Sequence, residues 1–169
     1  MNLYYKDLLP SNFSPNSRVW IYQCNRLFTL SEALEIEKIL ASFIHDWKAH
    51  GQPVKGFANL FFGQFIILIA DEEQTIVSGC STDSSVRLIK AIEEQLKVNL
   101  FDRTQLAFFI RDKIQLLPLS QIDYAITHQF LQHDTLFFDH SVSTKKEFEE
   151  RWIVPLSNSW LGRRYLVNI

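Results

Sequence analysis

Residues 57–70, FANLFFGQFIILIA, are the most apolar stretch of the 169-residue chain and decide its fold. The two halves of this stretch, 57–62 and 65–70, each have the length and the apolar, aromatic or β-branched content of a strand. Gly63 and Gln64 separate them, and either form the turn of a hairpin or bend one long strand. The run 65–70 is far shorter than the ~20 residues that cross a bilayer. We therefore expect core strands and no membrane anchor.

Helix signals stand on both sides of this stretch. Upstream, Thr29 and Glu32 have the spacing of a capping box, in which each side chain accepts one unpaired amide of a new helix. Apolar residues then recur at helical spacing as far as Trp47, and Gly51 stands where a left-handed C-cap would fall. Downstream, residues 81–85 are N-cap residues before a second apolar stripe.

Further strands are expected around the two helices. Their residues are apolar runs bounded by polar turns, at 19–22, 75–78, 106–110 and 114–117. From residue 18 to 110 the chain has the order strand, helix, strand, strand, helix, strand, which is that of a ferredoxin-like βαββαβ core. We predict an α+β fold, with an antiparallel sheet, two helices on one face and a C-terminal helical extension.

The chain is expected to be a single domain. Its α+β core covers 18–118, and an aromatic-rich extension with short helices at 121–132 and 145–152 covers 119–169 and packs on the core. The Phe-Phe pairs 61/62 and 108/109 place rings on opposite faces of a strand, so both faces of the sheet need cover. Either the extension or a second subunit supplies it, and we expect a homodimer.

Composition excludes several classes of function. The formal net charge is -2, so the chain has no overall positive field for nucleic acid or an anionic membrane. The N-terminus has no apolar segment behind basic residues, and the two cysteines, at 24 and 80, suit free thiols in a reducing compartment. We expect a cytoplasmic protein without nucleic-acid or membrane partners.

Cofactor motifs are also missing from the sequence. No Gly is followed by Lys and then Ser or Thr, so there is no phosphate loop, and no GxGxxG string occurs. The histidine pairs 45/50 and 128/133 lack the i, i+4 spacing that places two imidazoles on one helix face. We expect no metal, no cofactor and no ATPase activity.

The segment Ser78–Ser85, between a strand and a helix, is the candidate site. Helix N-terminal amides favour an anion, and hydroxyl and guanidinium groups add donors. The candidate ligand-binding residues are Ser81, Thr82, Asp83, Ser84, Ser85 and Arg87. The same residue types also cap helices that bind no ligand. The ligand would be a small anion.

Cys80 is the candidate catalytic residue, because a thiol near a helix N-terminus has a lowered pKa and becomes a nucleophile. Six residues separate Cys80 from Arg87, however, and a phosphatase-type loop has five between its Cys and Arg. Two functions remain open. The first is a binding or protein-interaction module, and the second is an enzyme or anion site that uses this segment with Cys80 as nucleophile.

Four strings resemble those of a family of short uncharacterised bacterial proteins often labelled "ABC transporter ATPase". They are WIYQ (20–23), GFANLFFGQFIILIA (56–70), SGCSTDSSVR (78–87) and LLPLS (116–120). The resemblance covers nearly the whole chain and implies a full-length single domain. The label implies a Walker A lysine, a signature motif and a Walker B carboxylate, and none of these can be placed on this sequence. The resemblance therefore implies no catalytic residue.

Overall fold

The computed structural model describes residues 2–73, 75–77 and 79–166, apart from the side chains of residues 80 and 81. The chain divides into two compact units. Residues 3–102 and 143–146 form the N-terminal unit. Residues 103–142 and the chain from 147 onward, together with Asn2, form the C-terminal unit.

The N-terminal unit is built on a three-stranded antiparallel sheet in the order β1-β5-β4. Strands β4 (Lys55–Phe61) and β5 (Phe65–Asp71) form a hairpin from the apolar stretch, and β1 (Arg18–Gln23) pairs with the other edge of β5. Residues 62–64 are a turn and not a bend within one strand. Every residue of β5 is buried, as expected of a central strand with both faces covered.

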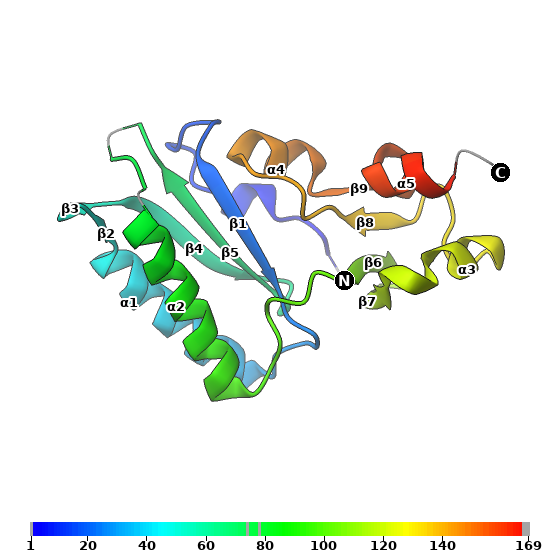
Figure 1. The fold of residues 1–169 in the computed structure, drawn as a ribbon, viewed down its shortest axis with the longest axis horizontal. Helices are drawn as coiled ribbons and strands as arrows, with labels where there is room; N and C mark the ends of the chain where they lie inside the picture. The colour runs from blue at the N-terminus through cyan, green and yellow to red at the C-terminus, as the bar shows by residue number, and fades with distance from the viewer. Residues whose placement is uncertain (1, 74, 78, 167–169) are drawn as a thin grey trace. The chain divides into compact units, whose positions relative to one another are not determined.

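Helices α1 (Leu30–Asp46) and α2 (Gly79–Leu96) lie on one face of this sheet (Figure 1). The predicted capping box is confirmed, because Glu32 N donates to Thr29 Oγ1 at 3.3 Å and Thr29 N donates to Glu32 Oε2 at 2.8 Å. The helices and the sheet share one core, whose members include Ile36, Leu40, Ile66, Leu68, Ile89 and Ile92. Each such aliphatic side chain gains roughly 1.5–3 kcal/mol from burial.

Two predictions beside these helices are wrong. Helix α1 ends at Asp46, and Gly51 lies with His50 in the turn between the short strands β2 (Lys48–Ala49) and β3 (Gln52–Pro53). Residues 75–77 form no strand. Val77 N donates to the Glu72 carboxylate at 3.0 Å. This amide therefore forms a local hydrogen bond with a side chain in place of one with a neighbouring strand. Residue 78 lies outside the described residues.

The 3-10 turn η1 (Lys6–Leu8) and residues 143–146 complete the N-terminal unit. The turn η1 precedes β1, and the Tyr5 ring before it meets the Phe61 ring edge-on at 6.3 Å. At the start of β1, Val19 N donates to Ser143 O at 2.9 Å, and Arg18 forms an antiparallel bridge with Thr144. A segment from late in the chain is therefore part of this unit.

The C-terminal unit contains a four-stranded antiparallel sheet in the order β7-β6-β8-β9. Its strands are β6 (Gln105–Ile110), β7 (Lys113–Pro118), β8 (Leu136–Phe138) and β9 (Ile153–Pro155). The other elements are η2 (Leu119–Gln121), α3 (Ile122–Thr127), α4 (Lys145–Arg151), η3 (Leu156–Asn158) and α5 (Trp160–Tyr165). Helix α4 begins in the N-terminal unit and ends in this one. Phe108 and Phe137, 5.3 Å apart between ring centroids, lie in the core of the unit.

The α+β class with antiparallel sheets is confirmed, but the four-stranded ferredoxin-like core is not evident from the sheet topology. β6, the strand expected to complete that core, pairs with β7 and β8 in a separate sheet. The predicted helical extension, residues 119–169, supplies strands β8 and β9, and its first helix ends at Thr127. Three-residue strands are too short for a periodic pattern, which explains why the sequence did not reveal them.

Candidate functional site

Residues 81–85 lie inside α2, so the expectation that they form a segment between a strand and the helix is wrong, whereas Arg87 lies in the helix as expected. The helix begins at Gly79, which places residues 82–85 in its first two turns. Ser85 is buried, and its hydroxyl donates to the Thr82 carbonyl at 2.7 Å, a bond within the helix. Asp83 is exposed. We therefore do not expect Ser85 to bind a ligand.

Cys80 and Ser81 belong to the first turn of α2, and their side chains lie outside the described part of the structure. The role of Cys80 as a nucleophile and the role of Ser81 as an anion ligand therefore remain predictions. The rate of Cys80 alkylation against pH tests the first of them, because a thiolate stabilised by a helix N-terminus reacts at lower pH than a free thiol. Cys24, in contrast, is buried, and burial raises the pKa of its thiol.

Ser84 and Arg87 line a groove between the C-terminal end of α1 and the first half of α2. We name it the Trp47–Arg87 groove. Its volume is about 500 Å³, and its residues are Phe43, Asp46, Trp47, Lys48, Ser84, Arg87 and Leu88. The structure thus brings two of the six predicted ligand-binding residues to one concave surface. Three apolar side chains, which the sequence analysis did not assign to a site, share it.

Trp47 forms the base of the groove because the chain leaves the helix there. It is 2% exposed and has an extended backbone, with φ -69° and ψ 119°. Gly56 of β4 makes room for its ring, because a Cβ at that position would lie 2.7 Å from Trp47 Cε3. The rings of Phe43 and Trp20 pack on it at centroid distances of 5.1 and 6.1 Å. The indole is therefore held firmly, which favours a preformed groove.

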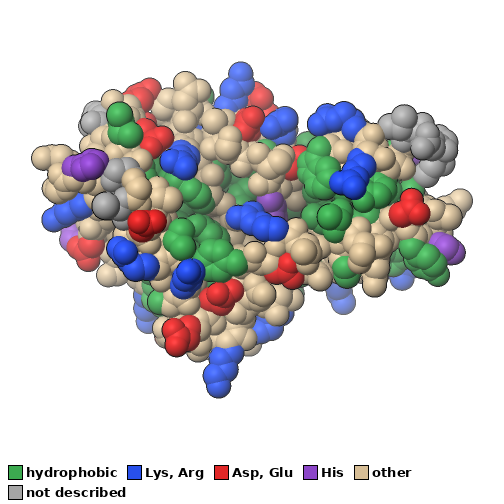
Figure 2. Space-filling view, viewed as in Figure 1, with side chains coloured by type: hydrophobic (Ala, Val, Ile, Leu, Met, Phe, Trp, Pro, Cys, Tyr) green, Lys and Arg blue, Asp and Glu red, His purple; other side chains and the backbone are tan. Residues whose placement is uncertain are grey.

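The rim of the groove carries more positive than negative charge. Arg87 and Lys48 are exposed cations, Asp46 is an exposed carboxylate, and Ser84 adds a half-buried hydroxyl. The half-buried side chains of Phe43 and Leu88 line the groove between these groups. Figure 2 shows Lys, Arg, Asp and Glu interspersed over this unit, with hydrophobic side chains gathered beside α2. The groove therefore suits an apolar group that carries negative charge.

Asp71 at the end of β5 is a buried carboxylate with a structural role. It accepts hydrogen bonds from Lys55 Nζ at 2.7 Å and from the backbone amides of Ser14 and Glu73, both at 3.2 Å. Burial alone would raise the pKa of Asp71, but these donors and the charge of Lys55 hold it below its ordinary value. The carboxylate ties the N-terminal segment to the sheet and, since its oxygens are occupied, does not suggest a general base.

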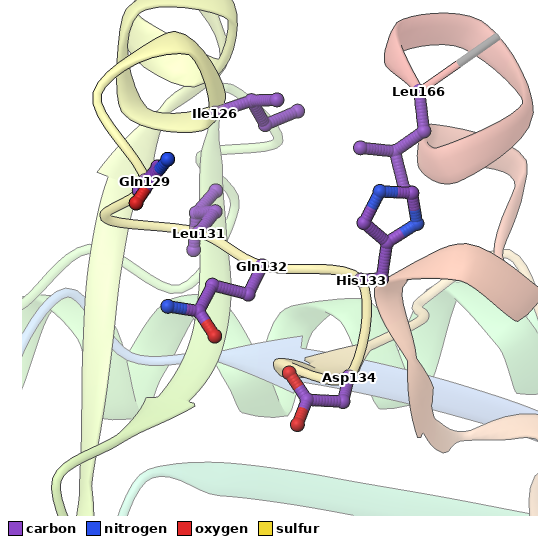
Figure 3. Close-up of a pocket in the computed structure, with 7 residues that line it drawn as sticks. All are labelled: Ile126, Gln129, Leu131, Gln132, His133, Asp134 and Leu166. Carbon is purple, nitrogen blue, oxygen red and sulfur yellow. The ribbon is translucent and has the colours of Figure 1, made fainter. Parts of the chain in front are cut away.

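A pocket of about 430 Å³ opens in the C-terminal unit beside the end of α3 (Figure 3). Ile126, Gln129, Leu131 and Gln132 lie on one side of it, and His133 and Leu166 lie on the other. Its polar side chains, those of Gln129, Gln132, His133 and Asp134, are all exposed. This pocket therefore indicates no particular ligand.

Comparison of the chain with models of protein families, with curated proteins and with solved structures finds no significant match. Among the described residues, no helix combines the length and apolar character that crossing a membrane requires. Within the same part of the chain, no cluster of three or more His, Cys, Asp or Glu side chains is placed to hold a metal ion.

Phe43, Trp47 and Lys48 could not be assigned to a site from the sequence, although Trp47 is buried as its pattern predicts. The apolar pattern assigned Phe43 and Trp47 to the buried face of a helix that was expected to continue towards Gly51. The helix stops at Asp46 instead, so Trp47 and Lys48 turn into the groove. The available signal was the charged residue Lys48 directly after an aromatic residue near the end of the apolar stripe.

Proposed function

We propose that the protein is a non-catalytic binding module that captures an acidic, apolar segment of a partner protein in the Trp47–Arg87 groove. The observation that carries the proposal is the combination of an apolar lining with two exposed cations, Arg87 and Lys48, on one open surface. Charge of this kind accelerates the encounter with an acidic partner, and the apolar contact supplies affinity.

The shape of the groove supports a segment of a protein more than a small molecule. Sites for small molecules bury most of the ligand surface, whereas this groove is open along the two helices. A peptide places one apolar side chain against Phe43 and Leu88 and an acidic side chain within reach of Arg87. Such binding is weakened by salt, since the cations are exposed.

The test uses three fluorescent peptides of equal length that alternate apolar with acidic, amide or basic residues. We expect the acidic peptide to bind the full-length protein, which raises the polarisation of the peptide's fluorescence. Arg87→Glu should weaken that binding at least about tenfold, because an attraction becomes a repulsion. The matched control is Lys38→Glu, which reverses an exposed charge on α1 outside the groove and should leave binding unchanged.

Two results would contradict the proposal. Equal binding of the acidic and the amide peptide would show that the cations play no part. Equal weakening by Arg87→Glu and Lys38→Glu would show a general charge effect with no groove involved. Inorganic phosphate is added as a competitor, and displacement of the peptide at low concentration would instead indicate a site for a free anion.

A second proposal concerns self-association, and a separate observation favours it. Leu30 and Leu34 are 78% and 52% exposed and lie one turn apart at the start of α1, and Leu27, 53% exposed, precedes the helix by three residues. Exposed apolar clusters of this kind are unusual on a monomer. We infer that two copies pair through these leucines, because a two-fold contact lets one patch cover itself.

Sedimentation measures the mass of the protein at micromolar concentration. We expect a dimer, and we expect Leu30→Glu together with Leu34→Glu to give a monomer that remains folded. Ser42→Glu, an exposed change further along α1, is the control and should stay dimeric. A monomer mass for the unchanged protein over the whole concentration range would refute this proposal and would leave the peptide proposal intact.

A further inference from the structure

A second, smaller pocket in the C-terminal unit gathers side chains of complementary chemistry. It has a volume of about 240 Å³. Its polar lining consists of the guanidinium of Arg103, the amide of Gln105, the imidazole of His140 and the hydroxyl of Ser141. The rings of Phe137 and Trp160 are among its apolar residues. These groups come from the chain before and within β6, from the turn after β8 and from α5. We name it the Arg103 pocket.

Sheet register explains why these residues meet. Phe108 pairs with Phe137, and Phe109 pairs with Leu136, across the antiparallel strands β6 and β8. Continuing this register past the end of β8 brings residue 140 opposite residue 105. The turn that follows β8 is closed by Asp139, whose Oδ1 accepts a hydrogen bond from Ser141 N at 2.9 Å. Two separate segments of chain are thereby held at one end of the sheet.

The charge of its lining residues gives the Arg103 pocket a preference for an anionic ligand. Arg103 is an exposed guanidinium, and no acidic side chain is among the residues that line the pocket. Burial, and then the positive charge of Arg103, lower the pKa of His140 to about 3. The imidazole is therefore neutral at pH 7 and adds no charge of its own. A cation beside neutral hydrogen-bonding groups favours an anion, and the carboxylate of Asp139, which lies next to the lining, is already engaged by the amide of Ser141.

The apolar part of the pocket selects the shape of that anion. The rings of Phe137 and Trp160 meet edge-on, with centroids 6.2 Å apart, and Phe137 is buried. Aromatic surfaces of this kind favour a flat apolar body. A planar guanidinium matches the two oxygens of a carboxylate, which bonds to it through two parallel hydrogen bonds. The volume leaves room for a ring-sized body with a single acidic group.

We propose that the Arg103 pocket binds a small organic carboxylate with a flat apolar body, held by the guanidinium of Arg103 at one end and by the half-buried ring of Trp160, which packs on Phe137, at the other. Gln105 and Ser141 supply further donors at the carboxylate end. This site is independent of the Trp47–Arg87 groove, which lies in the other unit and is lined by different residues.

The test titrates benzoate, benzamide and inorganic phosphate separately into the full-length protein and follows the NMR signal of the Trp160 indole. We expect benzoate to shift the signal in a saturable manner. Benzamide has the same shape without the charge, and phosphate has the charge without the ring, so both should bind at least about tenfold more weakly. Arg103→Gln should weaken benzoate binding by a similar factor while the melting temperature stays the same, since its side chain is exposed.

Arg163→Gln is the matched control, because it removes an exposed guanidinium from α5 of the same unit without touching the pocket lining. Benzoate binding should be unchanged in this variant. Equal binding of benzoate and benzamide, equal loss in the two arginine variants, or no saturable shift with benzoate would each overturn the proposal. Tighter binding of phosphate than of benzoate would likewise refute it and would assign the pocket to inorganic anions.

Discussion

Gly162 in α5 is the glycine at which an added methyl group has the largest expected effect. A Cβ there would overlap the carbonyl oxygen of Leu156 and lie 2.9 Å from its carbonyl carbon and 3.0 Å from Ser157 Cα. These are backbone atoms, so no side-chain rotation relieves the contact. The same Leu156 oxygen accepts a hydrogen bond from Ser159 Oγ at 2.7 Å, and Ser159 Oγ in turn accepts one from Gly162 N at 3.1 Å. Gly162→Ala therefore disturbs both the packing and the cap of α5.

The expected cost follows from two opposing effects. Overpacking costs up to about 3 kcal/mol, and a helical Gly→Ala change returns about 1 kcal/mol, which leaves a net loss of about 2 kcal/mol. For a chain of this length the melting temperature should fall by about 4–8 °C. Thermal unfolding followed by circular dichroism measures it. Gly79→Ala in α2 is the control, because a Cβ there meets nothing within 4 Å, and it should be neutral or stabilising. A similar fall in both variants would refute the reasoning.

Four further outcomes are expected. Thr29→Ala should lower the free energy of unfolding by about 1 kcal/mol in urea denaturation, because it removes the N-cap of α1, and Thr29→Ser should retain most of it. The Arg26 side-chain hydrogen bond and the Thr29 amide lower the pKa of Glu32 to about 2, so its contribution to stability is complete above its ordinary pKa of 4.5 and is lost as pH falls through 2. Glu32→Gln should accordingly flatten the dependence of stability on pH in that window. Asp71→Ala should cost about 2 kcal/mol in urea denaturation, because the amides of Ser14 and Glu73 lose their acceptor, whereas Lys55→Met should cost less. Calorimetric titration with Mg-ATP should show no specific binding, since the chain has no phosphate loop.

Elements with a long or chemically explicit pattern were predictable from the sequence. The capping box of Thr29 and Glu32 is such a pattern, because two side chains and two amides form it locally and tertiary contacts are not needed. The β4–β5 hairpin is another, since its apolar residues have to be buried wherever the sheet lies. Only the form of its turn was open, and Phe62 and Gly63 resolve it with positive φ values of 54° and 63°.

Pairing between distant strands was not predictable in the same way. Nothing in the residues of β6 says whether they pair with β1 or with a three-residue strand such as β8. The false strand at residues 75–77 shows the related problem of β-branched residues without a partner, and Ile76 is 75% exposed there. Strand content is a local property, whereas sheet membership depends on the whole fold.

The candidate site was predictable only in part for the same reason. Ser84 and Arg87 were identified because a helix start is visible in the sequence. Trp47 and Lys48 reach the groove because α1 stops one residue before Trp47, and a helix end is among the least certain features of a pattern. The residues of the Arg103 pocket are brought together by the β6–β8 register, which is not encoded by any local motif.

The discontinuity of the N-terminal unit has a consequence for synthesis on the ribosome. Three backbone hydrogen bonds join the start of this unit to residues 143–146. Val19 N donates to Ser143 O at 2.9 Å, Lys145 N donates to Ser17 O at 2.8 Å, and Lys146 N donates to Pro15 O at 2.9 Å. The first hundred residues therefore emerge without the segment that pairs with the start of β1, and the backbone groups of residues 15–19 lack these partners until residue 146 has left the ribosome. The time for which these backbone groups stay unpaired depends on how long residues 103–142 take to be synthesised. Slower translation between residues 103 and 142 would prolong it.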